Sequence, residues 1–167
     1  MLRIEATIKQ GYRVGSGTSA VDPRFNEDGG TIRLQSPEFK KRGLDCDAYF
    51  GGKIDEAWVC GTLGCDLTPR TVTILKPEYH FTGVRWTDKH DKPGEPPVTE
   101  NFFLSPAQIE FGGNSYKALL YIPDPATKPG HFHPPTTLEV IAQKVPDIAY
   151  GDRAALFYNP GAVQISE

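Results

Sequence analysis

Hydrophobic residues occur along the chain in short runs rich in Val, Ile, Thr, Tyr and Phe, and glycine or proline separates one run from the next. β-Branched and aromatic residues pack well on a pleated surface, whereas Gly and Pro favour turns. The pattern therefore predicts many short strands joined by turns. The predicted strands are residues 3–8, 12–14, 30–34, 57–60, 71–75, 81–86, 101–104, 107–111, 116–122, 138–142 and 154–158.

One stretch of the chain carries the signals of a short helix. Ser36 is a favourable N-cap, and Pro37 suits the first helical position because its missing N–H would have no helical partner there. Glu38 lies early and the basic residues 40–42 lie late, as the helix dipole favours, and Gly43 follows as a stop signal. We therefore expect one short helix that begins near Ser36.

Turn and loop signals separate the later strands. Gly112 and Gly113 predict a hairpin turn within residues 111–116. Residues 123–125, in which an aspartate lies between two prolines, predict an abrupt end to a strand. Residues 87–99 are too polar and too rich in proline for a strand, so we expect them to form a surface loop insertion.

These elements favour a single domain, residues 1–167, built as a closed β-barrel. The composition, with 38% hydrophobic and 23% charged residues, is that of a globular protein, and the length is that of one ordinary domain. A sheet with many strands needs its edges covered or joined, and closure into a barrel joins them. We therefore expect a mainly β fold with one short helix and extra hairpins.

Charge and cysteine content limit which partners and which cellular compartment we expect. The net charge of −3 provides no basic surface for phosphate contacts, so nucleic acid is not an expected partner. The first residues lack the features of a signal peptide, and no apolar run reaches the ~18 residues of a membrane helix. Cys46, Cys60 and Cys65 are an odd number of cysteines, which favours reduced thiols. We expect a cytoplasmic protein with no membrane partner.

The densest group of potential ligands is Gly130-His131-Phe132-His133, followed by Glu139. Two histidines one residue apart on a strand point to the same face, and Glu139 shares that face if the strand continues. The spacing is similar to the first metal-binding motif of cupins, which need a further histidine on a later strand, and none follows His133. The neighbouring prolines also fit a solvated surface turn. Metal ligand, phosphate or substrate contact and solvated turn all stay open.

Two other segments are candidates for anion and metal contacts. In Gly15-Ser16-Gly17-Thr18, small residues let backbone N–H groups approach a phosphate, although an ordinary turn has the same composition. Thr62 and Asp66 offer the hard oxygen ligands that Mg²⁺ accepts beside phosphate oxygens. A strand end with a solvated aspartate would look the same.

In their order along the chain, these segments resemble the archaeal CTP-dependent riboflavin kinase family. The matching segments are Val14-Gly15-Ser16-Gly17, the proline-led and lysine-rich residues 36–42, Gly61-Thr62-Leu63-Gly64, Phe103-Leu104-Ser105-Pro106, Gly112-Gly113, His131-Phe132-His133, Leu138-Glu139-Val140-Ile141-Ala142 and Gly151-Asp152. The resemblance implies a single closed six-stranded cradle-loop β-barrel. It also implies a nucleotide or flavin as the small-molecule ligand.

The resemblance assigns roles position by position. They are nucleotide binding for Gly15, Ser16, Gly17 and Thr18, Mg²⁺ binding for Thr62, substrate contact for His131, Phe132 and His133, and orientation or deprotonation of the acceptor by Glu139. One departure affects the metal: Gly64 replaces the metal-binding asparagine of the family, so Asp66 is the substitute ligand that we expect.

Three functions follow from this reading. The chain is a Mg²⁺-dependent phosphotransferase similar to riboflavin kinase, or a non-catalytic module that binds a ligand or partner, or a cupin-like metal enzyme that uses His131, His133 and Glu139. Phosphoryl transfer depends mainly on positioning and charge neutralisation, which a small barrel can supply. Because a fold does not determine a function, the choice depends on the site.

Overall fold

The computed structural model describes residues 1–10, 26–87, 93–94, 99–127 and 134–167. Among these residues it contains nine strands and two helices. The strands are β1 (Leu2–Lys9), β2 (Leu63–Asp66), β3 (Val72–Ile74), β4 (Tyr79–Val84), β5 (Glu100–Phe111), β6 (Asn114–Pro123), β7 (Thr137–Ala142), β8 (Arg153–Tyr158) and β9 (Val163–Ile165), and the helices are α1 (Thr31–Lys41) and α2 (Cys46–Phe50). Neither helix is long and apolar enough to cross a membrane.

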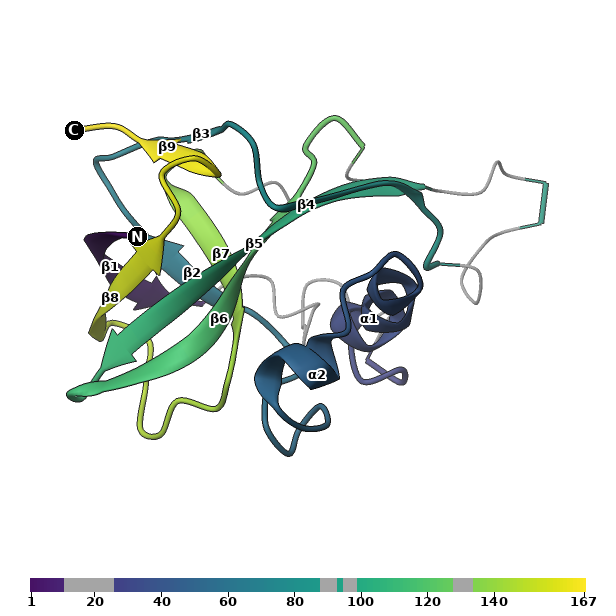
Figure 1. Cartoon of the computed structure of the whole chain (residues 1–167), viewed down its shortest axis with the longest axis horizontal. Coiled ribbons are helices and arrows are strands. Elements are labelled where there is room, and N and C mark those ends of the chain that lie inside the picture. The colour runs from purple at the N-terminus through teal and green to yellow at the C-terminus, as the bar shows by residue number, and fades with distance from the viewer. Residues whose placement is uncertain (11–25, 88–92, 95–98, 128–133) are drawn as a thin grey trace.

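Six antiparallel strands close into a barrel, in the order β5-β6-β7-β2-β1-β8, and β8 pairs back to β5. β4 is an extra strand that pairs with β5 outside the closed ring. Figure 1 shows the barrel, and β4 with the first half of β5 extending away from it. The predicted mainly β fold with a closed six-stranded barrel is therefore confirmed.

The long strand β5 changes its partner halfway. Its first half pairs with β4 as far as Leu104, and its second half pairs with β8 from Ala107, while β6 pairs with it from Phe102 to Phe111. Pro106 lies between these two stretches. A proline cannot donate a ladder hydrogen bond, so its position between the two partners suits the missing N–H.

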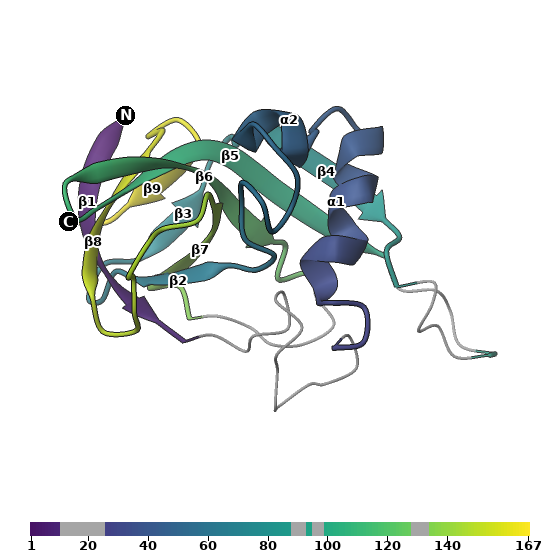
Figure 2. The same cartoon turned by 90° about the horizontal axis from the view of Figure 1, so that it is seen from below.

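The sheet separates two hydrophobic cores. The barrel core contains Ile109, Leu120 and Val140, and the helix-side core contains Leu119 and Ile141 from the same strands together with residues of both helices. Successive side chains of a strand point to opposite faces. Both faces of β6 from Ala118 onward, and both faces of β7, are therefore largely buried, one in the barrel and one beneath the helices. Figures 1 and 2 both place α1 and α2 on one side of β4 and β5.

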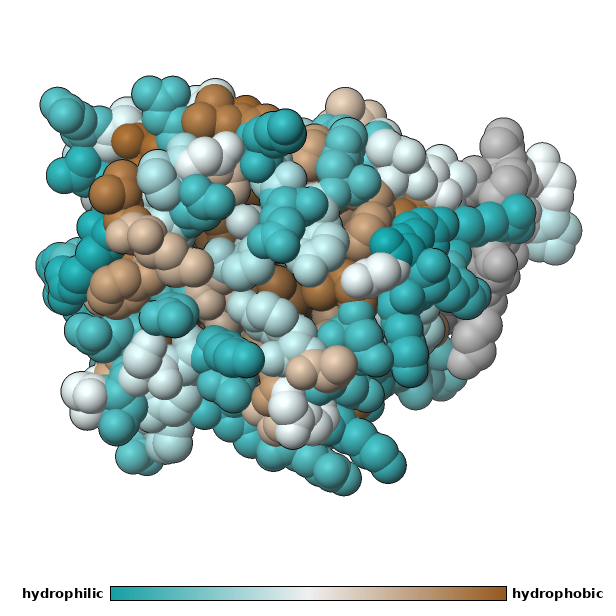
Figure 3. All heavy atoms as spheres, viewed as in Figure 1, coloured by the Kyte–Doolittle hydropathy of each residue, from teal (hydrophilic) through white to brown (hydrophobic). Residues whose placement is uncertain are grey.

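Helix α1 corrects two predictions. Residues 30–34 form no strand, and the helix begins at Thr31 instead of near Ser36, so that Pro37 lies inside it. Ile32, Gln35 and Phe39 are almost fully buried at helical spacing. We infer that the burial of this face outweighs the cost of an interior proline. Hydrophilic side chains dominate the outer surface around this helix (Figure 3).

The structure contains a second helix, α2, whereas only one helix was predicted. Asp45 caps it, since its Oδ1 accepts a hydrogen bond of 3.1 Å from the backbone N–H of Ala48. Gly51 ends it in the left-handed conformation, at φ 80°. Residues 57–60, predicted as a strand, contribute only isolated bridges at Trp58.

The remaining predictions differ in outcome. Strands at residues 3–8, 71–75, 81–86, 116–122, 138–142 and 154–158 are confirmed with shifted ends, as is the hairpin turn at Gly112 and Gly113. The predicted strands 101–104 and 107–111 are the single strand β5, and β2 and β9 were not predicted. Residues 12–14 and most of residues 87–99 lie outside the described residues.

A second, two-stranded sheet of β3 and β9 lies at one end of the barrel (Figure 1). Val163 is fully buried, and Val72 packs against the barrel core. The β3 side of this small sheet also forms one wall of the pocket that opens beside β7.

Candidate functional site

The barrel wall opens between β6 and β7. These strands pair only from Ala118 opposite Ala142 to Tyr121 opposite Glu139. Past this point β6 continues along β5 to Pro123, whereas the first residues of β7 pair with β2. The two strands therefore separate at one end of the barrel. We call this opening, beyond the Tyr121–Glu139 pair, the seam.

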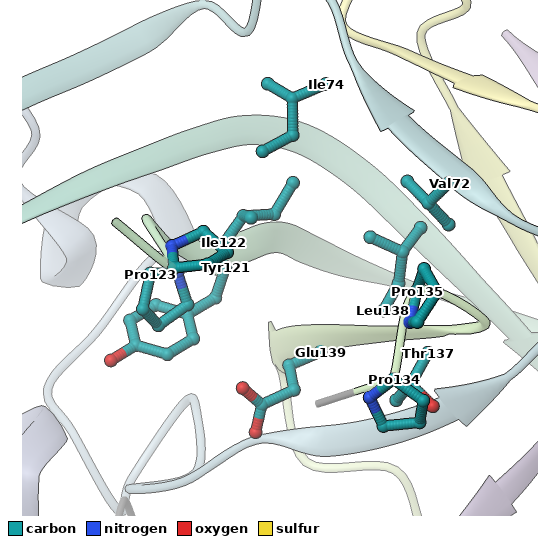
Figure 4. A pocket seen from close by; sticks show the side chains of 11 residues that line it. Val72, Ile74, Tyr121, Ile122, Pro123, Pro134, Pro135, Thr137, Leu138 and Glu139 are labelled. Carbon is teal, nitrogen blue, oxygen red and sulfur yellow. The ribbon is translucent and has the colours of Figure 1, made fainter. Parts of the chain in front are cut away.

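A pocket of about 340 Å³ occupies the seam. Its walls are mainly aliphatic side chains and proline rings (Figure 4). The lining residues are Val72, Ile74, Tyr121, Ile122, Pro123, Pro125, Pro134, Pro135, Thr137, Leu138 and Glu139. The Glu139 carboxyl group and the Tyr121 hydroxyl extend to the same side of this pocket in Figure 4. The described walls are therefore mainly apolar, and the third polar side chain of the lining, Thr137, lies beside Pro134.

Glu139 is held on its side of the pocket by a neighbouring hydroxyl group. Its Oε1 accepts a hydrogen bond of 2.8 Å from Thr62 Oγ1, which is supplied by the residue immediately before β2. On β7, Glu139 lies opposite Gly64 of β2 and Tyr121 of β6. A hydrogen bond to an ionised acceptor is stronger than one between neutral groups. Thr62 therefore both orients the carboxylate and stabilises its charged form.

Tyr121 contributes a neutral phenol to the site. Its hydroxyl donates a hydrogen bond of 2.6 Å to Oε1 of Gln35, which is 1% exposed on α1. Burial raises the pKa of Tyr121 well above its usual value, and the charges of Glu100 and Glu139 raise it further. The phenol therefore keeps its proton, and two carboxylates act on it electrostatically.

Glu100 is the second carboxylate, and it is 3% exposed. Its Oε2 accepts a hydrogen bond of 3.0 Å from Trp86 Nε1. A buried charge is costly unless hydrogen bonds compensate it, so this donor helps to keep Glu100 in place. Sequence reasoning missed Glu100, Tyr121 and Gln35. Gln35 shares a helical face with Ile32 and Phe39, which is a weak signal. Glu100 lies between two polar residues and Tyr121 resembles an ordinary core aromatic, so the local sequence marks neither.

The structure brings together two of the predicted site residues. Thr62 and Glu139, which are 77 positions apart, share a hydrogen bond. Asp66 is turned to its own loop, where Oδ1 accepts bonds from the backbone N–H and the hydroxyl of Thr68. If the chain is extended from residue 62, Thr62 and Asp66 lie about 13 Å apart along it at ~3.3 Å per residue. The proposed pairing of these two side chains on one Mg²⁺ ion stays a prediction.

The other predicted site residues lie outside the described residues: Gly15, Ser16, Gly17, Thr18, His131, Phe132 and His133. Within the described part of the chain, no group of three or more His, Cys, Asp or Glu residues is placed to hold a metal ion. Thr62 and Glu139 are the described neighbours that could contribute oxygen ligands. The Mg²⁺ expected from the resemblance therefore stays a prediction.

Position 64, next to the site, has no room for a side chain. A Cβ atom at this position would lie 2.9 Å from the carbonyl oxygen of Lys9, its partner on β1, and 3.3 Å from Lys9 Cγ. Atoms at the first distance overlap, and the carbonyl belongs to the backbone of a paired strand. An asparagine at position 64 would require β1 to shift.

We expect Gly64→Ala to lower the free energy of unfolding by about 1–3 kcal/mol, the usual cost of forcing extra atoms into a packed site. Urea denaturation would measure it. Lys9→Ala in the same background should restore little of the loss, because it removes Cγ but leaves the carbonyl oxygen. Wild-type stability of Gly64→Ala would show that β1 yields easily at Lys9.

Neither the known protein families nor the curated proteins provide a match to this sequence. The similarity to riboflavin kinases therefore depends on the sequence motifs alone, and the function has to be argued from the geometry of the seam.

Proposed function

We propose that this chain is a small-molecule-binding barrel and that its ligand occupies the pocket in the seam. The observation that carries the proposal is the position of Glu139: an oriented carboxylate stands on the wall of a pocket that is otherwise mainly apolar. Ligand sites commonly combine apolar walls with a few well-placed polar groups.

The shape and chemistry of the pocket favour a compact ligand with a flat or apolar body and a hydrogen-bond donor. The volume of about 340 Å³ lies at the lower end of the usual range for ligand pockets. Proline rings and aliphatic side chains pack against ring systems, and an ionised carboxylate accepts hydrogen bonds from hydroxyl or N–H groups. Flavins and nucleosides have these features, because each joins a flat ring with N–H groups to a sugar-like part with hydroxyls.

A Mg²⁺-dependent phosphotransferase is the second candidate. The contact between Thr62 and Glu139 favours it, because the resemblance to riboflavin kinases assigns the metal to the first residue and the acceptor hydroxyl to the second. In such a reaction the carboxylate of Glu139 would orient the acceptor hydroxyl, or take its proton as the phosphoryl group is transferred. A cupin-like metal enzyme would also use Glu139, but with His131 and His133.

The test is a binding screen with riboflavin, flavin mononucleotide, CTP and ATP, each with and without Mg²⁺. We expect at least one compound to raise the melting temperature, since a ligand at 100 times its Kd stabilises a protein by about 2.7 kcal/mol. Titration calorimetry should show binding weakened about tenfold or more by Glu139→Gln, which removes the charge and keeps the shape.

Glu110→Gln is the matched control, because it makes the same chemical change on β5 outside the pocket lining. It should leave binding unchanged. Formation of flavin mononucleotide from riboflavin and CTP only with Mg²⁺ would favour the phosphotransferase over a binding module. Absence of binding by all four compounds, or binding unaffected by Glu139→Gln, would contradict the proposed site.

A further inference from the structure

One wall of the seam pocket carries a buried hydroxyl group that has no hydrogen-bond partner. It belongs to Thr137, the first residue of β7, which lines the pocket beside Pro134 (Figure 4) and is 8% exposed. The backbone N–H of Thr137 donates to the carbonyl oxygen of Pro134 at 3.0 Å. Its Oγ1, by contrast, is buried and makes no hydrogen bond.

The neighbour of Thr137 on the next strand does not supply this hydrogen bond. Asp66 of β2 lies opposite Thr137, yet its Oδ1 accepts bonds from the backbone N–H and the hydroxyl of Thr68. A hydroxyl buried without a hydrogen bond costs free energy, and each such group needs an explanation. Valine has nearly the same shape and suits a strand as well, without this cost. Packing alone therefore does not explain the hydroxyl of Thr137.

The position of Thr137 places this hydroxyl within reach of a ligand. A threonine side chain has three staggered positions about χ1, so Oγ1 can turn toward the pocket without any movement of β7. Thr137 lies two residues before Glu139, so both side chains are on one face of the strand, about 6.6 Å apart along it. A ligand of ring size can therefore contact Thr137 whether or not it also reaches Glu139.

We propose that the Thr137 hydroxyl binds the ligand of the seam pocket directly. The inference rests on the proposed function and specifies its ligand: an apolar or flat body carries a neutral hydroxyl, carbonyl or amide group, which pairs with Thr137. A hydroxyl both donates and accepts, so it pairs with each of these groups. A buried ion also needs a charged partner, which a hydroxyl does not supply. Binding then satisfies a polar atom that the free protein leaves without a hydrogen bond.

Benzyl alcohol and ethylbenzene test this contact, because they differ only in a terminal hydroxyl or methyl group, and Thr137→Val makes the same exchange on the protein. Binding is measured by titration, from the NMR shifts of the Ile122 and Leu138 methyl groups, which line the pocket. We expect Thr137→Val to weaken binding of benzyl alcohol about threefold to tenfold, the usual contribution of one hydrogen bond, and binding of ethylbenzene about twofold or less. Thr137→Ser keeps the hydroxyl and should retain the wild-type affinity ratio.

The melting temperature separates this role from a structural one. Because Oγ1 makes no hydrogen bond in the free protein, Thr137→Val should melt at the wild-type temperature or above it. Ser105→Ala is the matched control, since Ser105 Oγ is also buried without a hydrogen bond, but on β5 and outside the pocket lining. It should leave both affinities unchanged.

The wild-type protein decides the question even if the variants fold poorly. Nuclear Overhauser contacts should join the Thr137 methyl group to the CH₂ group of benzyl alcohol, and their absence while the ring contacts Leu138 would overturn the inference. Equal effects of Thr137→Val on both fragments, or a melting temperature that falls in Thr137→Val and recovers in Thr137→Ser, would overturn it too. Each of these results leaves the proposed binding site standing. If no fragment, flavin or nucleotide shifts the methyl signals, the proposed function is overturned as well.

Discussion

Replacing Phe39 by alanine should lower the free energy of unfolding by about 3–5 kcal/mol, the usual cost of deleting a fully buried aromatic side chain. Phe39 is completely buried where α1 meets the sheet. Its ring stacks on Phe81 of β4 at 5.6 Å between centroids and contacts Phe102 of β5 edge-on at 5.2 Å. Alanine would remove both ring contacts and leave a cavity beneath the helix.

Urea denaturation followed by circular dichroism would measure this loss. Lys40→Ala is the adjacent control on α1, since its side chain is 69% exposed and its ion pair with Asp45 is 3.6 Å long. Exposed ion pairs contribute little, so we expect a change of about 0.5 kcal/mol or less. A similarly small effect of Phe39→Ala would mean that α1 is not packed on β4 and β5.

Phe39 also shows why the helix was mispredicted from sequence. Ile32, Gln35 and Phe39 are spaced as one helical face, but Pro37 interrupts that pattern and the apolar residues before it resemble a strand. Local signals place proline at a helix start. The face is recognisable only once the sheet that buries it is known, because tertiary packing outweighs local propensity here.

Pro106 led to a second error, in which one strand was predicted as two. A proline normally excludes a central strand position, so residues 101–104 and 107–111 were predicted as two strands. They form one strand because β6 pairs with both without a break, while the partner on the other edge changes from β4 to β8 around Pro106. The change of partner depends on residues distant in sequence and has no signature within β5 itself.

The sequence indicated single residues of the candidate site, but it did not indicate which of them contact one another. Thr62 and Glu139 were both singled out from their local motifs, yet their hydrogen bond depends on the pairing of β2 with β7. Tyr121 lies in a predicted strand, where its ring is indistinguishable from a core residue. Its link to Gln35 requires α1 to cover β6, which the sequence alone did not reveal.

The two cores lie on opposite faces of β7, so the two sides of the seam differ. Leu138, just before Glu139 on β7, belongs to the barrel core, and Glu139 and Tyr121 project to the other face, where the helices lie. A ligand in the seam would therefore contact both layers of the fold at once. Its apolar body would extend the barrel core, and its polar group would meet residues that α1 helps to position.

This two-core arrangement predicts that two adjacent leucines of β6 are equally costly to remove. Leu119 and Leu120 are both fully buried, Leu119 in the helix-side core and Leu120 in the barrel core. Each Leu→Ala change should lower the free energy of unfolding by about 2–5 kcal/mol. If one face of the strand were solvated, one of the two substitutions would change the free energy of unfolding by only about 0.5 kcal/mol or less.

The second half of β5 supplies that one-faced strand as a control. Ile109 is fully buried and its neighbour Gln108 is exposed, so Ile109→Ala should cost about 2–5 kcal/mol and Gln108→Ala about 0.5 kcal/mol or less. Urea denaturation of the four variants would compare the two strands under one set of conditions. A small loss for Leu119→Ala, beside a large one for Leu120→Ala, would mean that the helices do not pack on the outer face of β6. The seam would then lack the layer that holds Gln35 against Tyr121, because that hydrogen bond requires α1 to lie over the same face.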